Sequence, residues 1–162
     1  MRHVDAQVPL IAAGGSRFAL IVSRFNDAIT SRLRDGARAA LIEAGAGDEQ
    51  VSVYAVPGAF ELPQAARCVA ESGRFDAIVC LGCVIRGETP HFEYIAAAVA
   101  HGLMAASGET GVPIAFGVLT TDTWEQAEVR ASEGRDNKGF EAAAAALEMA
   151  ALFKAVRGDG RR

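Results

Sequence analysis

The sequence predicts a three-layer α/β/α sandwich built on a four-stranded parallel sheet. Short apolar runs rich in β-branched residues alternate with longer segments whose apolar residues have helical spacing. No internal repeat or low-complexity linker interrupts the alternation, and 162 residues are enough to bury a core. We therefore expect a single domain over residues 1–162.

Four segments have the composition of strands that are buried on both faces, because each is apolar and bounded by turn residues. The candidate strands are Phe18–Ser23, Val51–Val56, Ala77–Leu81 and Ile114–Leu119. The preceding residues 1–16 contain Val8, Leu10 and Ile11. We expect them to form an extended arm or an edge strand.

The segments between and after these strands have helical patterns. The predicted helices are Asp27–Ala44, Glu61–Ser72, His91–Ser107, a short one at Thr123–Glu128 and a final one at Lys138–Val156. Asp122 and Thr123 are most simply caps of the short helix. Residues 158–162 are expected to be a disordered tail. The order of strands and helices is flavodoxin-like.

Composition narrows the possible partners and compartments. The net charge of −4 and the pI near 5.4 argue against a nucleic-acid partner. The uncharged stretch Tyr94–Ser107, which contains His101, falls short of the roughly 20 residues that span a bilayer. The first ten residues lack the apolar core of a signal peptide. An odd number of cysteines, three, indicates reduced thiols, so we expect a cytoplasmic protein.

Two predicted helical stretches, Tyr94–Ser107 and Glu141–Val156, are apolar on nearly every side. A helix at the surface of a monomer this small normally keeps one polar face. We therefore expect a homo-oligomer in which these helices are buried between subunits.

Unusual residue choices follow each predicted strand. The segments are SRFND, PGAFELP, GCVIRGETPH and TTDTWEQAEVR. In an open parallel sheet, ligands bind beyond the carboxyl ends of the strands. All four segments should therefore meet at one rim, and this convergence indicates a ligand site better than any single motif.

His91 is the candidate for proton transfer. Thr89 reads as a helix N-cap and Pro90 as the first helical residue, which places His91 in the first turn. The partial positive charge of a helix start disfavours a protonated imidazole, so His91 is expected to accept a proton. The amides around Gly87–Thr89 are expected to hold an anion. The alternative is a surface histidine after a helix cap, and the rim position favours function.

Other rim residues are open to two interpretations each. Arg130 is either a bidentate phosphate ligand or a solvated arginine. Phe25 either stacks on a planar ligand or packs in the core, and the core is the better expectation for Phe60. Glu61 stands at a predicted helix start, where the partial positive charge of the helix favours a carboxylate even without a ligand.

Cys80 and Cys83 form a CxxC pair. Cys80 belongs to an apolar strand and should point into the core, and neither a second CxxC nor a nearby histidine completes a zinc site. HExxH, P-loop and GxGxxG motifs are absent from the sequence. We therefore expect neither a metal site nor a redox function.

Five motifs together resemble the lumazine synthase family in order and spacing. They are SRFN, PGAFELP, GCVIRGETPHFEYI, FGVLTTDTWEQAEVR and NKGFEAAAAALEM, and they cover roughly Phe18 to Val156. The third joined to the fourth is highly specific, whereas GAFE alone is weak. The resemblance implies a cofactor-independent condensation of 5-amino-6-(D-ribitylamino)uracil with 3,4-dihydroxy-2-butanone 4-phosphate. It also implies an oligomer, because many family members form pentamers and twelve pentamers can close into an icosahedral shell, and it implies riboflavin synthase as a candidate partner.

The resemblance also implies a role for each matching residue. His91 would transfer protons, and Phe116 would come from a neighbouring subunit. The residues implied to bind the pyrimidine and ribityl groups are Phe25, Asn26, Ala59, Phe60, Glu61, Cys83, Val84, Ile85, Phe116 and Lys138. Those implied to hold the phosphate are Glu88, Thr89 and Arg130.

The chain departs from the family pattern in the loop after Arg130, which reads RASEGRDNKG. A cation is missing at Gly134, and Arg135 is its nearest replacement, so the size of the assembly stays open. Two alternatives remain beside an active synthase. One is the related archaeal-type riboflavin synthase, and the other is a flavin-binding or shell-forming paralogue without turnover. Loss of His91 or Arg130 would mark the paralogue, and both residues are present.

Overall fold

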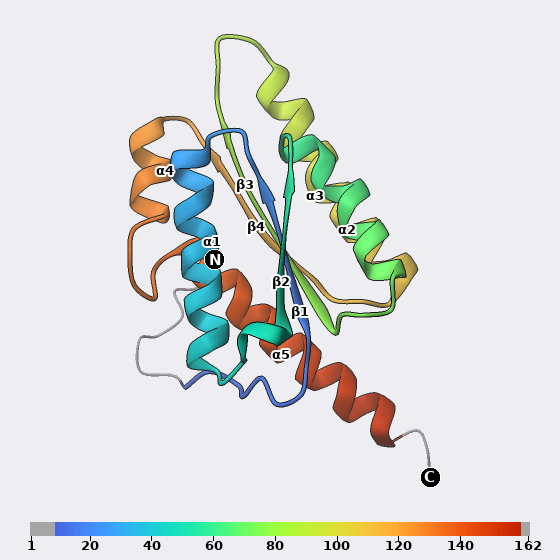
Figure 1. Ribbon diagram of the computed structural model, residues 1–162. Helices are drawn as coiled ribbons and strands as arrows, with labels where there is room; N and C mark the ends of the chain where they lie inside the picture. The colour runs from blue at the N-terminus through green and yellow to red at the C-terminus, as the bar shows by residue number, and fades with distance from the viewer. Residues whose placement is uncertain (1–8, 160–162) are drawn as a thin grey trace.

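The computed structural model describes residues 9–159 and has the predicted sandwich architecture (Figure 1). One parallel sheet with the order β2-β1-β3-β4 contains β1 (Phe18–Ser23), β2 (Val51–Val56), β3 (Ala77–Ile85) and β4 (Ile114–Thr121). One face is covered by α1 (Asp27–Glu43), α4 (Trp124–Arg130) and α5 (Lys138–Asp159). The other face is covered by α2 (Leu62–Glu71) and α3 (His91–Thr110). Two short 3-10 turns precede β2 and α2, η1 (Asp48–Gln50) and η2 (Ala59–Glu61).

The neighbouring strands β3 and β4 continue further than the sequence pattern predicts. The bounds of β1 and β2 are as predicted, but β3 extends to Ile85 and β4 to Thr121. These extensions pair with each other through Ile85 and Thr121, whereas the pairing of β3 with β1 stops at Leu81. The sequence pattern places Thr120 and Thr121 in a loop. In the structure they continue β4, because the end of β3 pairs with them.

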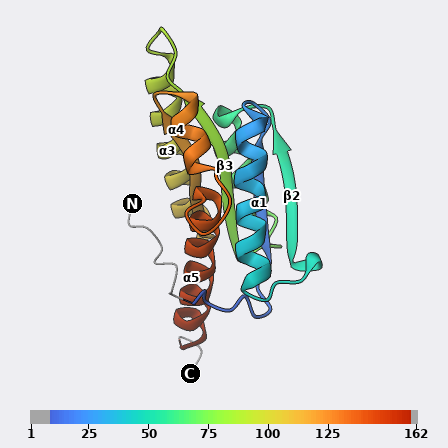
Figure 2. The same ribbon diagram turned by 90° about the vertical axis from the view of Figure 1, so that its left-hand side faces the viewer.

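Position in the sheet decides burial. β1 is buried along its whole length, as predicted for a strand covered on both faces. β2 is an edge strand with only Val56 buried, so that prediction is wrong for it (Figure 2). β4, at the other edge, exposes Phe116 and Thr120.

The strands contribute side chains to two apolar cores, one on each face of the sheet, because alternate residues of a strand point to opposite faces. Phe18, Leu20 and Leu147 belong to the core under α1 and α5. Ile21 and Val99 belong to the core under α2 and α3.

Helix α1 crosses the start of α5 at a very short distance. A Cβ at Gly139 would lie 1.9 Å from the carbonyl oxygen of Leu33, so only glycine fits there. Asn137 caps α5, because its Oδ1 accepts from the N–H groups of Gly139 (2.8 Å) and Phe140 (3.2 Å). Its side-chain amide donates to the Arg32 carbonyl, 3.1 Å away, which ties the cap to α1.

The two ends of the described chain depart from prediction. Residues 9–15 contain no strand, so the edge-strand interpretation is wrong for them, and Val8 lies outside the described residues. Helix α5 continues through Asp159, so the expected tail is helical at Gly158 and Asp159. Residues 160–162 lie outside the described range.

The outer surfaces of α3 and α5 carry exposed apolar side chains. Tyr94 and Met104 on α3 are each 75% exposed, and Val156 on α5 is 63% exposed. Among the described helices, none combines the length and the hydropathy that a membrane crossing requires.

Candidate functional site

A cavity of about 410 Å³ lies beyond the carboxyl ends of the strands, on the side of the sheet covered by α2 and α3. Its lining residues are Phe25, Gly58, Ala59, Phe60, Cys83, Val84, Ile85, Gly87, Thr89, His91, Phe92 and Ile95. The cavity therefore brings together residues that follow β1, β2 and β3 and residues from the start of α3.

The first wall of the cavity is the loop after β1. Asn26 has a left-handed backbone (φ 59°), a conformation that asparagine tolerates better than most residues. Its Nδ2 donates to the Cys83 carbonyl, 3.0 Å away, and the Phe25 N–H donates to the Pro57 carbonyl, 3.1 Å away. These bonds fix the loop against β2 and β3 and leave the Phe25 ring 70% exposed.

The second wall is the turn after β2. The Glu61 carboxylate accepts from the Gly58 N–H, 2.9 Å away, which closes the turn. Phe60, which the sequence favoured as a core residue, is 61% exposed, so that prediction is wrong. The closed turn directs this ring to the surface, while Ala59 is buried.

The floor of the cavity is the part of β3 that extends past the end of β1. The Cys83 carbonyl faces the β1 side, where it accepts from Asn26. Because backbone groups alternate in direction along a strand, the N–H and C=O of Ile85 face the same side. β1 has already ended there, so these groups are available to a planar polar ligand.

The third wall is the start of α3. Pro90 occupies the N-cap position and no side chain caps the helix, so the predicted Thr89 cap is wrong. The Pro90 carbonyl accepts from the Glu93 N–H (3.0 Å), and the helix begins one residue after the sequence signal. Thr89 and His91 both line the cavity instead. His91 is exposed and is the first residue of α3, as predicted.

A profile of the family described as 6,7-dimethyl-8-ribityllumazine synthase matches residues 15–154. The chain belongs to this family. A 6,7-dimethyl-8-ribityllumazine synthase from Syntrophus aciditrophicus (strain SB) is 56% identical to it over 146 residues, which is 90% of this chain and 95% of the relative.

Some residues implied by the lumazine synthase resemblance do not line this cavity: Asn26, Glu61, Glu88, Phe116, Arg130 and Lys138. Asn26 and Glu61 shape it from behind through the hydrogen bonds described above. Arg130 ends α4, and its Nη1 donates to the Gln126 carbonyl, 3.0 Å away. The Nζ of Lys138 is bound to both Glu141 oxygens, at 2.8 and 2.9 Å.

Three residues of the lining were not identified from the sequence, Gly58, Phe92 and Ile95. Ile95 lies four residues after His91, and residues with this spacing share one face of a helix. The helical pattern therefore contained this information once His91 was assigned to the site.

The cysteines near the cavity are held in the thiol form. Cys83 is 2% exposed, and burial raises its pKa to about 11. Burial also raises the pKa of Cys80, which is fully buried as predicted. Within residues 9–159, no group of three or more histidine, cysteine or acidic side chains is arranged to hold a metal ion.

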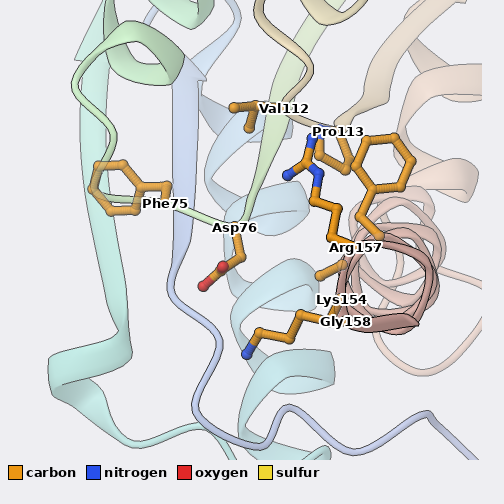
Figure 3. Close-up of a pocket in the computed structure, with 9 residues that line it drawn as sticks. Phe75, Asp76, Val112, Pro113, Lys154, Arg157 and Gly158 are labelled. Carbon is orange, nitrogen blue, oxygen red and sulfur yellow. The ribbon is translucent and has the colours of Figure 1, made fainter. Parts of the chain in front are cut away.

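A second cavity, of about 310 Å³, lies at the opposite end of the sheet between the start of β4 and α5 (Figure 3). Arg157 lies against Val112 and Pro113 in this view, and it donates to the Gly111 carbonyl, 2.9 Å away. The Asp76 carboxylate accepts from the Arg17 N–H, 2.7 Å away. The first contact joins α5 to the loop before β4, and the second joins the loops before β1 and β3.

A third cavity, of about 750 Å³, separates α1 from the loop at 131–137. Arg135 is ion-paired with Glu43 of α1, and its guanidinium lies 5.5 Å from the centre of the Phe140 ring. Arg135, the nearest replacement for the family's cation that this chain lacks at Gly134, is therefore directed to α1.

Proposed function

We propose that this chain condenses 5-amino-6-(D-ribitylamino)uracil with 3,4-dihydroxy-2-butanone 4-phosphate to give 6,7-dimethyl-8-ribityllumazine in riboflavin biosynthesis. One observation carries the proposal. Exposed phenylalanine rings, an unpaired strand edge and a histidine line a single cavity in a chain of this family.

The pyrimidine is assigned to the space between Phe25 and the end of β3. The exposed Phe25 ring offers a flat apolar face to the heterocycle. The N–H and C=O of Ile85 offer a donor and an acceptor to its polar edge. Ala59 and Phe60 border the same cavity and are assigned to the ribityl chain.

His91 is assigned to proton transfer. The amine of the pyrimidine attacks the ketone and water leaves to give an imine, phosphate is eliminated, and the ring closes with loss of a second water. Each step moves protons between nitrogen, carbon and oxygen. A positioned imidazole typically accelerates such steps by about 10²–10⁴-fold. The remaining acceleration is assigned to the alignment of two substrates.

The phosphate of the four-carbon substrate is assigned to the loop before α3, with Glu88 and Thr89. The start of a helix attracts anions through its free N–H groups and its partial positive charge. Thr89 lines the cavity and adds a hydroxyl donor. Arg130 is assigned to the same phosphate as a bidentate cation.

A neighbouring subunit is assigned the residues that a single chain holds away from the cavity, namely Phe116, Arg130 and Lys138. The exposed apolar side chains of α3 and α5, such as Tyr94 and Met104, support burial between subunits. The assembly is proposed to be a cytoplasmic homo-oligomer of pentamers, of which an icosahedral shell is one form, with riboflavin synthase as a candidate partner.

The test is a spectrophotometric assay of the purified protein with both substrates, in which the lumazine chromophore is followed. Appearance of the chromophore well above the uncatalysed rate supports the proposal. No acceleration in an assembled sample would contradict it and would favour a flavin-binding or shell-forming protein. Conversion of added lumazine product to riboflavin would instead indicate a riboflavin synthase.

A further inference from the structure

The loop that carries the anion-binding amides has no internal support. Within residues 9–159, the backbone and side chains of Gly87, Glu88 and Thr89 form no hydrogen bond. Gly87 and Thr89 nevertheless line the cavity, and His91 follows two residues after Thr89. The position of the loop therefore depends on how its two ends are fixed.

Arg86 fixes both ends of this loop. Its N–H donates to the Thr121 carbonyl at the end of β4, 2.8 Å away. Its side chain donates from Nε to Asp122 at 2.8 Å and from Nη1 to Glu93 at 3.1 Å. Asp122 follows β4 and Glu93 lies in the first turn of α3, so one guanidinium bridges the strand end and the helix start.

The same guanidinium packs on the cavity wall. Its central carbon lies 4.5 Å from the centre of the Phe92 ring, within the range of a cation–π contact. Phe92 is buried, lines the cavity and directly follows His91. Arg86 therefore restrains the residues on both sides of His91 without lining the cavity itself.

The bridge continues to α4. The Asp122 N–H donates to the Gln126 Oε1, 2.9 Å away, and the Gln126 carbonyl accepts from Arg130, 3.0 Å away. Gln126 thus links the carboxylate that holds Arg86 to the arginine assigned to phosphate. Hydrogen bonding to Asp122 raises the pKa of Arg86, which keeps the bridge charged at any working pH.

We propose that Arg86 is a positioning residue, which holds the loop at 87–89 and the His91 end of α3 in register with the end of β4 for the condensation. This inference rests on the proposed function. Exposed ion pairs add little to global stability, so the effect of Arg86 should be local. A catalytic group displaced by about 1 Å can cost about 100-fold in rate.

The experiment compares Arg86→Gln with the matched control Arg67→Gln. Arg67 is also exposed and bridges two carboxylates, Glu71 and Glu109, but it joins α2 to the far end of α3. Both variants remove one charge and two ion pairs. Arg86→Lys keeps the charge but loses the planar guanidinium that bonds to two carboxylates at once, and much of the contact with the Phe92 ring.

We expect Arg86→Gln to lower kcat by about 10-fold or more, with the KM for the pyrimidine within about 2-fold of wild type. Arg86→Lys should recover part of the loss. Hydrogen–deuterium exchange should become faster at the amides of Arg86 and Glu93. Arg67→Gln should keep the wild-type kcat, and both glutamine variants should have similar unfolding temperatures.

Wild-type kcat in Arg86→Gln would overturn the inference, as would an equal loss of kcat in Arg67→Gln. If the wild-type chain shows no turnover, the proposed function fails separately. Exchange at Arg86 and Glu93 then decides whether Arg86 positions the loop, and unchanged exchange would reject it.

Discussion

The two ends of the parallel sheet differ in how their loops are held. At the amino end, Arg17 is bonded to Asp76, Arg157 to the Gly111 carbonyl, and Ser107 to the Val112 carbonyl. At the carboxyl end, the loop at 87–89 has no hydrogen bond to any described residue, and the ring of Phe25 is largely exposed. The amino-end loops are bonded to one another and to the ends of α3 and α5, whereas at the carboxyl end the loop at 87–89 leaves its donors unused and Phe25 leaves its apolar face exposed.

This difference indicates which end binds a ligand. Backbone groups that are paired within the protein contribute to stability and have little left for a ligand. Groups around a cavity that are unpaired within the protein can exchange their bonds to water for bonds to a ligand. Substitutions at the carboxyl end should therefore change turnover, and substitutions at the amino end should change stability.

The largest expected effect is that of His91→Ala. Removal of the proton-transfer group should lower kcat by about 10²–10⁴-fold. His91 is exposed, so the unfolding temperature and the assembly should be unchanged. Steady-state kinetics and size-exclusion chromatography check this, and near-wild-type turnover would remove His91 from the mechanism.

The second prediction concerns the thiols at the carboxyl end. With a pKa of about 11, Cys83 is deprotonated in only about one molecule in a thousand at pH 8, against about a tenth for a thiol with the ordinary value near 9. Cys68 is exposed and should react with a thiol reagent first. Mass spectrometry of the labelled peptides reports the sites, and the denatured chain, in which all three thiols should react, is the control. Fast labelling of Cys83 in the native protein would contradict its burial.

The same raised pKa gives a pH dependence of stability. A thiol whose pKa is higher in the folded chain than in the unfolded chain stabilises fully below the unfolded value, near 9, and loses this contribution as pH rises to about 11. The wild-type chain should therefore lose more free energy of unfolding between these pH values than Cys83→Ala does. Denaturant melts at pH 8 and pH 10.5 measure the difference, and equal losses would argue against the shift.

Arg130→Ala should have a smaller effect, confined to one substrate. Loss of a bidentate cation should raise the KM for the phosphorylated substrate by about 10-fold and leave the KM for the pyrimidine nearly unchanged. Separate titration of each substrate checks this. An equal rise in both KM values would count against a phosphate role.

The smallest effect is expected at the amino end. Arg157→Ala removes the bond to the Gly111 carbonyl and the contact of the guanidinium with Phe153, 5.0 Å from the ring centre. The free energy of unfolding should fall by about 0.5–1.5 kcal/mol, with kcat unchanged. Lys154→Ala, beside it in the same cavity, is the matched control and should change neither. A fall in kcat for Arg157→Ala would contradict the expectation that substitutions at the amino end change stability and not turnover.

Local patterns were sufficient for much of the fold. The apolar runs predicted all four strands and their parallel arrangement, because strand periodicity and flanking turns are properties of neighbouring residues. The same holds for His91, which stands at a helix start, and for Thr123, whose Oγ1 accepts from the Gln126 N–H as a cap. The Thr89 cap failed because a one-residue shift at a proline is decided by the path of the whole loop.

The sequence by itself determined the elements, their order and the rim on which the functional side chains gather, since these follow from periodicity and chain connectivity. Only the tertiary structure decided that β3 extends past the end of β1, that Phe60 faces solvent, and that Arg86 bridges the end of β4 and the start of α3. Each of these depends on the register between segments far apart in the chain, and register is set by packing across the sheet, which no local pattern contains.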